Sequence, residues 1–178
     1  MLLNCAGYAV LGNIENIPYS AYKKNLELNF FAPLVLTKNI IPKMKKKKSG
    51  QIINLISGVG NRGLPGVSSY CVTKFALNGF SESLRVEMSK YHIDVITISP
   101  GLVKTAFNKN AKIYGFLKKT FNTGIKKDAN IIAREIVKAS IRRKKNAVLS
   151  FKTLFGIYLS FFFPGFLDNF LYKKFFSK

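Results

Sequence analysis

Short apolar runs alternate along this chain with longer segments in which apolar residues recur every three or four positions. Brief apolar runs that end at Gly or Pro are typical of strands, and the longer period is typical of amphipathic helices. The strand-like runs cover residues 1–7, 51–56, 93–99 and 147–151, and the helical pattern covers residues 19–44, 70–90 and 128–140. Asp128 is the expected N-cap of the last helix. Residues 93–99 (IDVITIS) alternate little and are strongly apolar, as expected of a parallel strand covered on both faces.

The longest helical segment, residues 19–44, carries Asn29 near its middle and Pro33 four residues later. Proline has no N–H group, so the backbone carbonyl of Asn29 loses its usual helical hydrogen-bond partner. A carbonyl freed in this way can hold a water molecule. The alternative is a polar residue at an ordinary proline kink.

The stretch from Ser57 to Lys74 carries the candidate chemistry. It leaves a strand, crosses a glycine-rich loop and enters a helix in which Tyr70 and Lys74, four residues apart, share one face. An ammonium beside a phenol favours the phenolate and lowers a pKa that is ordinarily about 10. Ser57 is placed to hydrogen-bond the same reacting oxygen, and the three residues together predict a proton-transfer site. A Tyr-x-x-x-Lys pair alone is also common as an ordinary helix-face pair.

The same loop contains a misleading motif. Gly58, Gly60 and Gly63 match the spacing of the dinucleotide-binding fingerprint and follow a strand. A Leu-Pro-Gly turn follows them where a helix should start, and the acidic residue about twenty positions on, Glu82, lies within a helical pattern. We therefore interpret these glycines as loop flexibility near a substrate and not as a pyrophosphate site.

Two further motifs accompany Ser57, which lies thirteen residues before Tyr70. Residues 4–7 (NCAG) end the first strand, and residues 100–105 (PGLVKT) follow a later one. With these motifs the chain resembles the short-chain dehydrogenase/reductase family over about residues 1–150. The resemblance implies a three-layer α/β Rossmann-like fold with a parallel sheet. It also implies a nicotinamide cofactor, either NAD or NADP, and hydride transfer between an alcohol and a carbonyl.

The resemblance implies a role for each matching residue. Tyr70 would be the acid and base, Lys74 would lower its pKa and hold the nicotinamide ribose, and Ser57 would orient the carbonyl. Asn29 would bind a water that relays protons toward Lys74. The implied cofactor-binding residues are Asn4, Ala6, Gly7, Tyr70, Lys74, Pro100, Gly101, Val103 and Thr105. Of these, the Val103 backbone and the Thr105 hydroxyl would contact the carboxamide, unless residues 100–105 form a turn without a ligand role.

The main departure from the family lies at the start of the sequence. Family members open with a strand, a glycine-rich turn and a helix that hold the pyrophosphate, whereas this sequence starts at what corresponds to the fourth strand. We therefore expect an N-terminally truncated fold with strands 4 to 7 retained, an exposed parallel-sheet edge and poor solubility. A rival hypothesis is a catalytically inactive remnant or a membrane-associated interaction protein, because the pyrophosphate lacks its helix N-terminus.

Composition bounds the remaining possibilities. With 178 residues and 48% hydrophobic content, the chain suits one domain, residues 1–150, followed by a tail, residues 151–178. The formal net charge of +21 invites a nucleic-acid interpretation. Basic runs at residues 45–48 and 142–145, however, sit at helix ends, where cations complement the helix dipole, so we expect no nucleic-acid partner.

Cysteine and histidine usage argues against disulfides and metals. Cys5 and Cys71 do not suit a disulfide framework, so we expect a reducing compartment and place the chain on the cytoplasmic side. Neither cysteine has metal-ligand spacing. The single histidine, His92, gives little support to a zinc site or a histidine-based triad, and we expect no metal.

Residues 106–127 show no clear period. In the family this region is the mobile substrate lid, and the aromatic residues Phe107, Tyr114, Phe116 and Phe121 would favour an apolar substrate. An ordinary surface insertion is the alternative. The resemblance also implies a homodimer through the helices that bear Asn29 and Tyr70.

The tail from Leu154 to Phe176 is strongly aromatic. Its longest uncharged stretch, residues 153–167, has 15 residues and contains Pro164 and Gly165, whereas a bilayer-spanning helix needs roughly 20. Flanking lysines and phenylalanines suit a helix pair at a membrane surface, at the endoplasmic reticulum if the organism is a eukaryote. Packing of the tail against the domain is the alternative.

Overall fold

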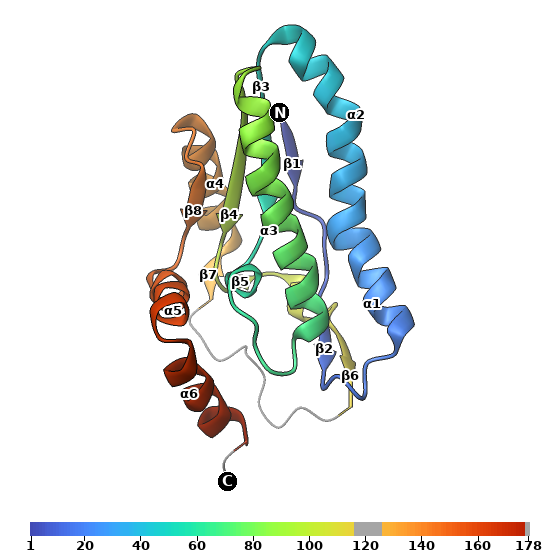
Figure 1. Ribbon diagram of the computed structural model, residues 1–178, viewed down its shortest axis with the longest axis vertical. Helices are drawn as coiled ribbons and strands as arrows, with labels where there is room; N and C mark the ends of the chain where they lie inside the picture. The colour runs from blue at the N-terminus through green and yellow to red at the C-terminus, as the bar shows by residue number, and fades with distance from the viewer. Residues whose placement is uncertain (116–125, 177–178) are drawn as a thin grey trace.

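Four parallel strands form the centre of the molecule (Figure 1). The structure, a computed structural model, describes residues 1–115 and 126–176. The strand order is β1-β3-β4-β8, built from Leu2–Asn4, Gly50–Leu55, Ile93–Ser99 and Asn146–Val148. β1 and β8 are the two outer strands, and within the described ranges β3 alone pairs with β1 in this sheet. The α/β fold with a parallel sheet expected from the sequence is confirmed.

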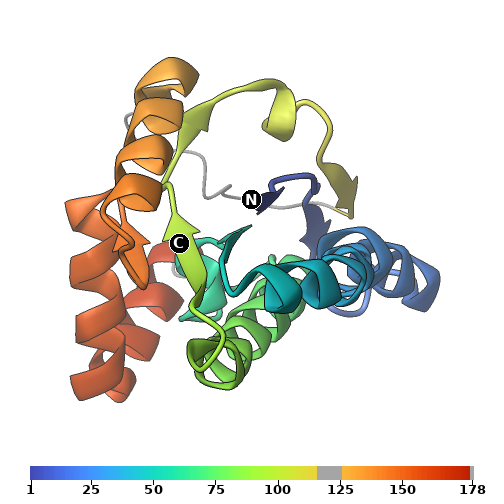
Figure 2. The ribbon, with the colours of Figure 1, turned by 90° about the horizontal axis from the view of Figure 1, so that it is seen from above.

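Helices cover both faces of the sheet and give the molecule three layers (Figure 2). One face is covered by α1 (Tyr19–Leu26), α2 (Ala32–Lys47) and α3 (Ser68–Ser89), and the other by α4 (Ala129–Ile141). Successive strand residues alternate between the faces. Ile52 and Val95 pack toward α2 and α3, whereas Ile53, Ile96 and Ile98 pack toward Ala139 of α4. Because both faces are buried, β4 is apolar along most of its length.

The first long helical segment changes its winding at Asn29. A π-helical turn, Glu27–Phe31, joins α1 to α2, and the N–H of Ala32 donates to the carbonyl of Glu27. Pro33 lies in the first turn of α2. The prediction of one helix over residues 19–44 is therefore right in position but wrong in detail, because an extra residue is accommodated just before the proline. Such π turns are rare and frequently mark functional sites.

Several short elements escaped prediction, because two or three residues are too few to show a period. β2 (Val10–Gly12) pairs with β6 (Lys112–Tyr114), and β5 (Val103–Lys104) pairs with β7 (Lys127–Asp128). The predicted strand over residues 147–151 also differs, since β8 ends at Val148 and Phe151 already begins a helix. The predicted N-cap of α4 is confirmed: Asp128 Oδ1 accepts a hydrogen bond from the N–H of Asn130 at 2.8 Å.

The tail forms two helices beside β8, α5 (Phe151–Phe162) and α6 (Pro164–Phe176), drawn in red at the lower left of Figure 1. Leu167 and Leu171 of α6 are buried, whereas most aromatic side chains of the pair are exposed. Within residues 1–115 and 126–176, no helix combines the length and the apolar character needed to cross a membrane.

Candidate active site

The candidate residues gather at one edge of the sheet because its strands are parallel. Residues 5–7 follow β1, Ser57 follows β3 and Pro100 follows β4, so all three loops leave the carboxyl edge. The first turns of α3 lie at this same end of the molecule (Figure 1). Ligands of open α/β sheets bind outside this edge.

Tyr70 and Lys74 lie one turn apart on α3. The Lys74 Nζ is 5.7 Å from the centre of the Tyr70 ring and donates a hydrogen bond to the backbone carbonyl of Leu55 at 2.8 Å. Lys74 is buried, with 4% of its surface exposed, and Tyr70 is half-buried. The amine is therefore anchored at the last residue of β3, two residues before Ser57.

Burial dominates the acid–base properties of both side chains. It raises the pKa of Tyr70 well above its ordinary value, and a hydrogen bond with the Ser57 side chain offsets part of that rise. Burial lowers the pKa of Lys74 from 10.5 to about 8, with Cys5 acting in the opposite direction. The expected lowering of the Tyr70 pKa is therefore wrong, because the loss of hydration outweighs the hydrogen bond with Ser57.

Asn29 is fully buried, and its side-chain amide binds the backbone of Tyr8. Its Oδ1 accepts from the Tyr8 N–H at 3.1 Å, and its Nδ2 donates to the Tyr8 carbonyl at 2.9 Å. A Cβ added to Gly7 would lie 2.9 Å from Asn29 Oδ1 and 3.9 Å from Lys74 Nζ. The loop after β1, the π-helical turn and α3 therefore meet at Asn29 and Lys74, and glycine permits this close approach.

Sequence reasoning missed the side chains that hold Asn29 and Tyr8 in place. Asn29 Nδ2 also donates to Thr73 Oγ1 at 3.1 Å, and Asn25 Nδ2 donates to the Tyr8 carbonyl at 2.9 Å. Ser69 Oγ in turn donates to Asn25 Oδ1 at 3.3 Å. Their spacing could have predicted this network, because Asn25 and Asn29 are four residues apart, as are Ser69 and Thr73. Two such pairs on neighbouring helices indicate a polar contact between their facing sides.

The predicted cofactor-binding residues around β1 occupy different settings. Asn4 is buried, and its Nδ2 donates to Asn54 Oδ1 at 2.7 Å, while Asn54 Nδ2 donates to Ser81 Oγ of α3 at 2.8 Å. Asn4 therefore connects two strands to α3. Ala6 is exposed and Gly7 is half-buried, and both lie in the loop at the carboxyl edge.

The loop after β4 returns toward α3. Gly101, directly after Pro100, has a φ of +76°, which favours glycine, and a Cβ there would lie 2.9 Å from that of Ser150. Val103 is half-buried in β5, and Thr105 is exposed, with its Oγ1 accepting from the N–H of Phe107 at 3.3 Å. The loop therefore keeps the Thr105 hydroxyl at the surface near the start of α3.

Aromatic residues after this loop have separate positions. The ring of Phe107 lies 5.7 Å from that of Tyr70, centre to centre. Tyr114 lies in β6 and packs against a cluster that contains Val10 and Ile17. Phe116 and Phe121 lie outside the described residues. Phe107 is thus an aromatic residue placed directly beside the candidate acid and base.

The glycines of the loop after β3 serve close packing. Gly58–Gly60 form a 3₁₀ turn, and the next helix begins only at Ser68. A Cβ on Gly60 would lie 2.9 Å from the carbonyl oxygen of Lys74, and one on Gly58 would lie 2.6 Å from Thr153 Cγ2. Direct contact with α5 and α3 therefore replaces the interpretation as loop flexibility for Gly58 and Gly60, whereas a Cβ on Gly63 would meet nothing within 4 Å.

The assembled groups suit proton transfer. A phenol, an amine and a hydroxyl meet at one edge, and such groups act as general acids and bases. Cys5 is exposed and Cys71 is buried, and both are free thiols. The described part of the chain contains no cluster of three or more His, Cys, Asp or Glu side chains that could hold a metal ion.

Sequence comparison finds relatives of one kind. The profile of the short chain dehydrogenase family matches residues 1–113. Dehydrogenase/reductase SDR family member 7B of Mus musculus is 33% identical over 171 residues, which cover 93% of this chain and 52% of that protein. The uncharacterized oxidoreductase YusZ of Bacillus subtilis is 40% identical over 106 residues, covering 60% and 38% of the two chains. The chain spans about half the length of the curated relatives it matches.

Solved structures share the fold over nearly the whole chain. A short-chain dehydrogenase from Streptomyces avermitilis superimposes with a TM-score of 0.82 and 25% identity, covering 97% of this chain and 68% of that one. A short-chain dehydrogenase from Burkholderia cenocepacia, solved in complex with NADP, has a TM-score of 0.79 and 21% identity, with 96% and 67% covered. Both have the parallel sheet and flanking helices described above.

Proposed function

We propose that this chain, which belongs to the short-chain dehydrogenase/reductase family, is an NAD(P)-dependent oxidoreductase that interconverts an alcohol and a carbonyl compound. The observation that carries the proposal is the meeting of Ser57, Tyr70, Lys74 and Asn29 at the carboxyl edge of the sheet. A bound nicotinamide would supply or accept the hydride, and the protein side chains would manage the proton.

Tyr70 would donate its proton to the developing alkoxide during reduction and take one back during oxidation. Its raised pKa keeps the hydroxyl protonated in the ligand-free chain, which suits the donating role. Lys74, with a pKa of about 8, exchanges protons near neutral pH and would resupply Tyr70. Ser57, which hydrogen-bonds Tyr70, would hold the substrate carbonyl oxygen in place.

Asn29 would hold the water that relays protons toward Lys74. The closeness of both side chains to Gly7 supports this role, because a Cβ there would contact Asn29 and Lys74 at once. The network from Asn29 to Tyr8 and Thr73 would keep the relay in one arrangement during turnover.

The residues at the carboxyl edge fit a nicotinamide cofactor, either NAD or NADP. Ala6 and the Thr105 hydroxyl are exposed there, and Gly7 and Gly101 lie in the same two loops. We assign cofactor contacts to Ala6, Gly7, Val103 and Thr105, and the ribose contact to Lys74 and Tyr70. Asn4, Pro100 and Gly101 would shape the loops that carry those contacts.

The substrate would be a small apolar alcohol or carbonyl compound, because the Phe107 ring lies against Tyr70. A homodimer through α2 and α3 is supported by apolar side chains exposed on both helices, among them Val35, Leu36, Val72 and Phe75. Free thiols suit the cytoplasmic side, and the aromatic tail suits association with a membrane surface there, or at the endoplasmic reticulum of a eukaryote.

Replacement of Tyr70 by Phe tests the proposal. We expect Tyr70→Phe to abolish NAD(P)H-dependent reduction of apolar ketones and aldehydes while the fold, followed by circular dichroism, is unchanged. Tyr91→Phe, which removes a phenol hydroxyl at the other end of α3, is the matched control and should retain the wild-type rate. Turnover by Tyr70→Phe at the wild-type rate would refute the assignment.

The alternative is a catalytically inactive remnant or a membrane-associated interaction protein. The observation that favours it is the tail, on which most aromatic side chains are exposed. Fluorescence titration of the purified chain with NADH and NADPH separates the two functions. Saturable micromolar binding supports the enzyme, whereas absence of binding to either nucleotide supports the alternative.

A further inference from the structure

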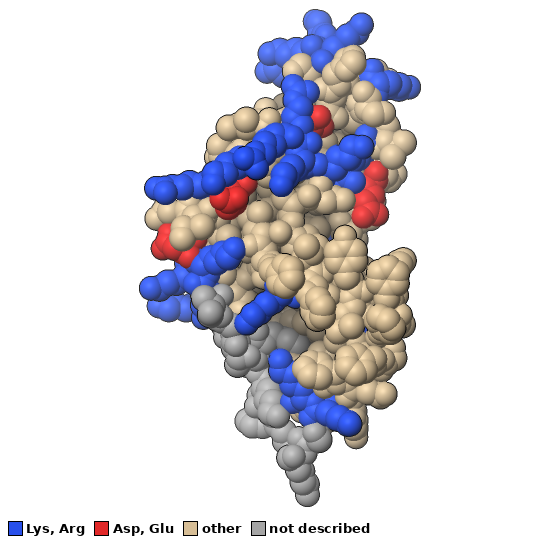
Figure 3. All heavy atoms as spheres, turned by 90° about the vertical axis from the view of Figure 1, so that its left-hand side faces the viewer, with Lys and Arg blue, Asp and Glu red and all other residues tan. Residues whose placement is uncertain are grey.

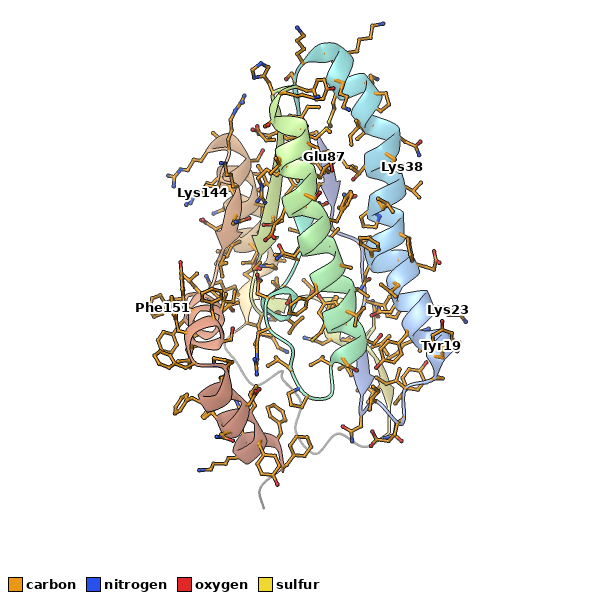
Figure 4. The ribbon with its side chains drawn as sticks, viewed as in Figure 1. Tyr19, Lys23, Lys38, Glu87, Lys144 and Phe151 are labelled. Carbon is orange, nitrogen blue, oxygen red and sulfur yellow. The ribbon has the colours of Figure 1, made fainter. Side chains whose placement is uncertain are left out.

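Aromatic side chains form a nearly continuous exposed surface on the tail, which we name the aromatic face. On α5, the exposed residues Phe151, Phe155, Tyr158 and Phe162 follow one another at steps of four, three and four positions, which places them on one side of the helix. Phe166 and Phe170, four residues apart on α6, are also exposed, and we count them as part of the face. In Figure 4, Phe151 lies on the outer side of α5, away from α3. Their exposed fractions range from 52% to 80%.

The inner sides of α5 and α6 pack against the domain. Leu167 and Leu171 are buried, and Leu154 and Ile157 are half-buried against the domain. Thr153 lies against Gly58, and Asp168 of α6 forms an ion pair with Arg62 of the loop that follows Ser57. The tail is therefore fixed on the domain by one side, while the aromatic side chains next to that side stay exposed, with Tyr158 and Phe162 lining a hollow between the tail and the domain.

The charges around the aromatic face are positive. In the sequence of residues 151–176, Asp168 is the single acidic residue, and it is paired with Arg62, whereas Lys152, Lys173 and Lys174 are basic and exposed. Figure 3 shows the broad uncharged area over the lower part of this side of the molecule, with Lys and Arg side chains above and below it. A second copy docked on this face would bring its own Lys152, Lys173 and Lys174 close to the same lysines of the first copy. An anionic surface would be attracted to them.

We propose that the aromatic face is a docking surface for an anionic lipid membrane. The helix pair would lie in the plane of the interface, with its aromatic side chains about 5–10 Å into the boundary between headgroups and acyl chains. The lysines would contact anionic headgroups, since each basic residue near such a surface contributes to attraction. This arrangement assigns the partner to a membrane surface and defines the side chains that enter it.

The aromatic face lies next to the candidate active site, and what this means for substrate entry rests on the proposed function. The start of α5 touches both catalytic-edge loops, because Thr153 lies against Gly58 and Ser150 against Gly101. A membrane bound by the aromatic face would therefore lie beside the edge that carries Ser57 and Tyr70. An apolar substrate dissolved in the lipid would then enter the site from the membrane side.

Sedimentation of the full chain with lipid vesicles tests the docking surface. We expect the wild type to bind phosphatidylcholine vesicles that contain phosphatidylserine, and the triple variant Phe155→Ser, Tyr158→Ser, Phe162→Ser to bind at least about tenfold more weakly. The matched control replaces Ile14, Val86 and Ile141 by Ser, which removes three exposed apolar side chains outside the tail. The control should bind as the wild type does, and circular dichroism should show both variants folded.

The charge contribution has its own control. The variant Lys152→Gln, Lys173→Gln should lose affinity for the anionic vesicles, by about fivefold for each lysine, and added salt should reduce the difference. The variant Lys46→Gln, Lys47→Gln changes two exposed lysines at the opposite end of the molecule (Figure 1) and should not change the affinity.

Three outcomes would overturn the proposal. The first is that the wild type does not sediment with anionic vesicles. The second is that the triple variant and its control lose the same amount of vesicle affinity. The third is that the wild type forms a dimer that the triple variant does not form, while the wild type binds no vesicles. The last outcome would assign the face to a second copy of the chain. Tyr70→Phe should bind vesicles as the wild type does, so failure of the enzyme hypothesis leaves the docking result independent.

Discussion

Folded proteins usually expose polar side chains and bury apolar ones. The network around Asn29 instead buries polar side chains, and the aromatic face of the tail instead exposes apolar ones. Around Asn29, several amide and hydroxyl side chains are fully or almost fully buried: Asn25, Asn29, Ser69 and Thr73. On the tail, phenylalanine and tyrosine side chains are exposed over two helices. Buried polar groups and large exposed apolar patches are the informative exceptions in a folded protein, whereas scattered exposed apolar residues are ordinary.

The two regions differ in how their groups are satisfied. Each buried polar side chain of the network has hydrogen-bond partners within the chain, such as Tyr8 and Thr73 for Asn29. The side chains of the aromatic face, in contrast, are more than half exposed, so the described residues leave most of their surface uncovered. The network is therefore satisfied within the chain and fixes the edge that carries Tyr70 and Lys74, whereas the aromatic face would be covered only by the proposed membrane.

We expect the largest change in the free energy of unfolding when Asn29, which binds both Tyr8 and Thr73, is replaced. Asn29→Ala would leave the Tyr8 N–H without its partner and open a small cavity, and we expect it to lower the free energy of unfolding by about 3–4 kcal/mol. Asn39→Ala, on the exposed side of α2, is the control and should change it by less than about 0.5 kcal/mol. Urea denaturation measures both. Equal stabilities for the two variants would show that the network does not stabilise the fold.

The next effect concerns pH. Burial holds the pKa of Lys74 at about 8, whereas the unfolded chain keeps that proton up to 10.5. The folded state therefore releases the proton first, and stability should rise by as much as about 3 kcal/mol between these two pH values. Lys74→Met should lack this rise, whereas Lys47→Met, at an exposed position, should follow the wild type.

Cys71 and Tyr70 change the pH dependence of stability in the opposite direction, over the upper part of the range between pH 8 and 10.5. Burial raises the pKa values of Cys71 and Tyr70, so the unfolded chain loses these protons first and stability falls as pH increases. The measurement is therefore the difference between wild type and Lys74→Met at each pH, which retains both groups in each protein. A difference that stays constant from pH 8 to 10.5 would contradict the depressed pKa of Lys74.

Much of the fold follows from local patterns in the sequence. β4 coincides with the predicted run Ile93–Ser99, and Asp128 caps α4 as expected. These features depend on neighbouring residues, so a single sequence contains the information. The positions of Tyr70 and Lys74 on one helix face belong to the same class, because a spacing of four fixes them once α3 is recognised.

Other features depend on contacts between distant residues and left no local signal. The role of Gly60 is set by the backbone of Lys74, and the raised pKa of Tyr70 is set by how much of the chain surrounds it. Sequence spacing indicated the neighbouring charge but not the loss of hydration. Likewise, the aromatic tail was predicted as a helix pair, yet which of its sides packs on the domain depends on Gly58 and Arg62, far away in the chain.

The smallest effect should come from the aromatic face itself. If its side chains serve an external partner, Phe155→Ser should change the free energy of unfolding by less than about 0.5 kcal/mol, because Phe155 is 59% exposed. Leu171→Ala, on the buried side of α6, should cost about 2 kcal/mol or more. Amide hydrogen exchange in α5 and α6 measures both, even where the tail opens without the domain. A loss of protection in Phe155→Ser as large as in Leu171→Ala would show that the face packs within the protein, and the contrast with the Asn29 network would disappear.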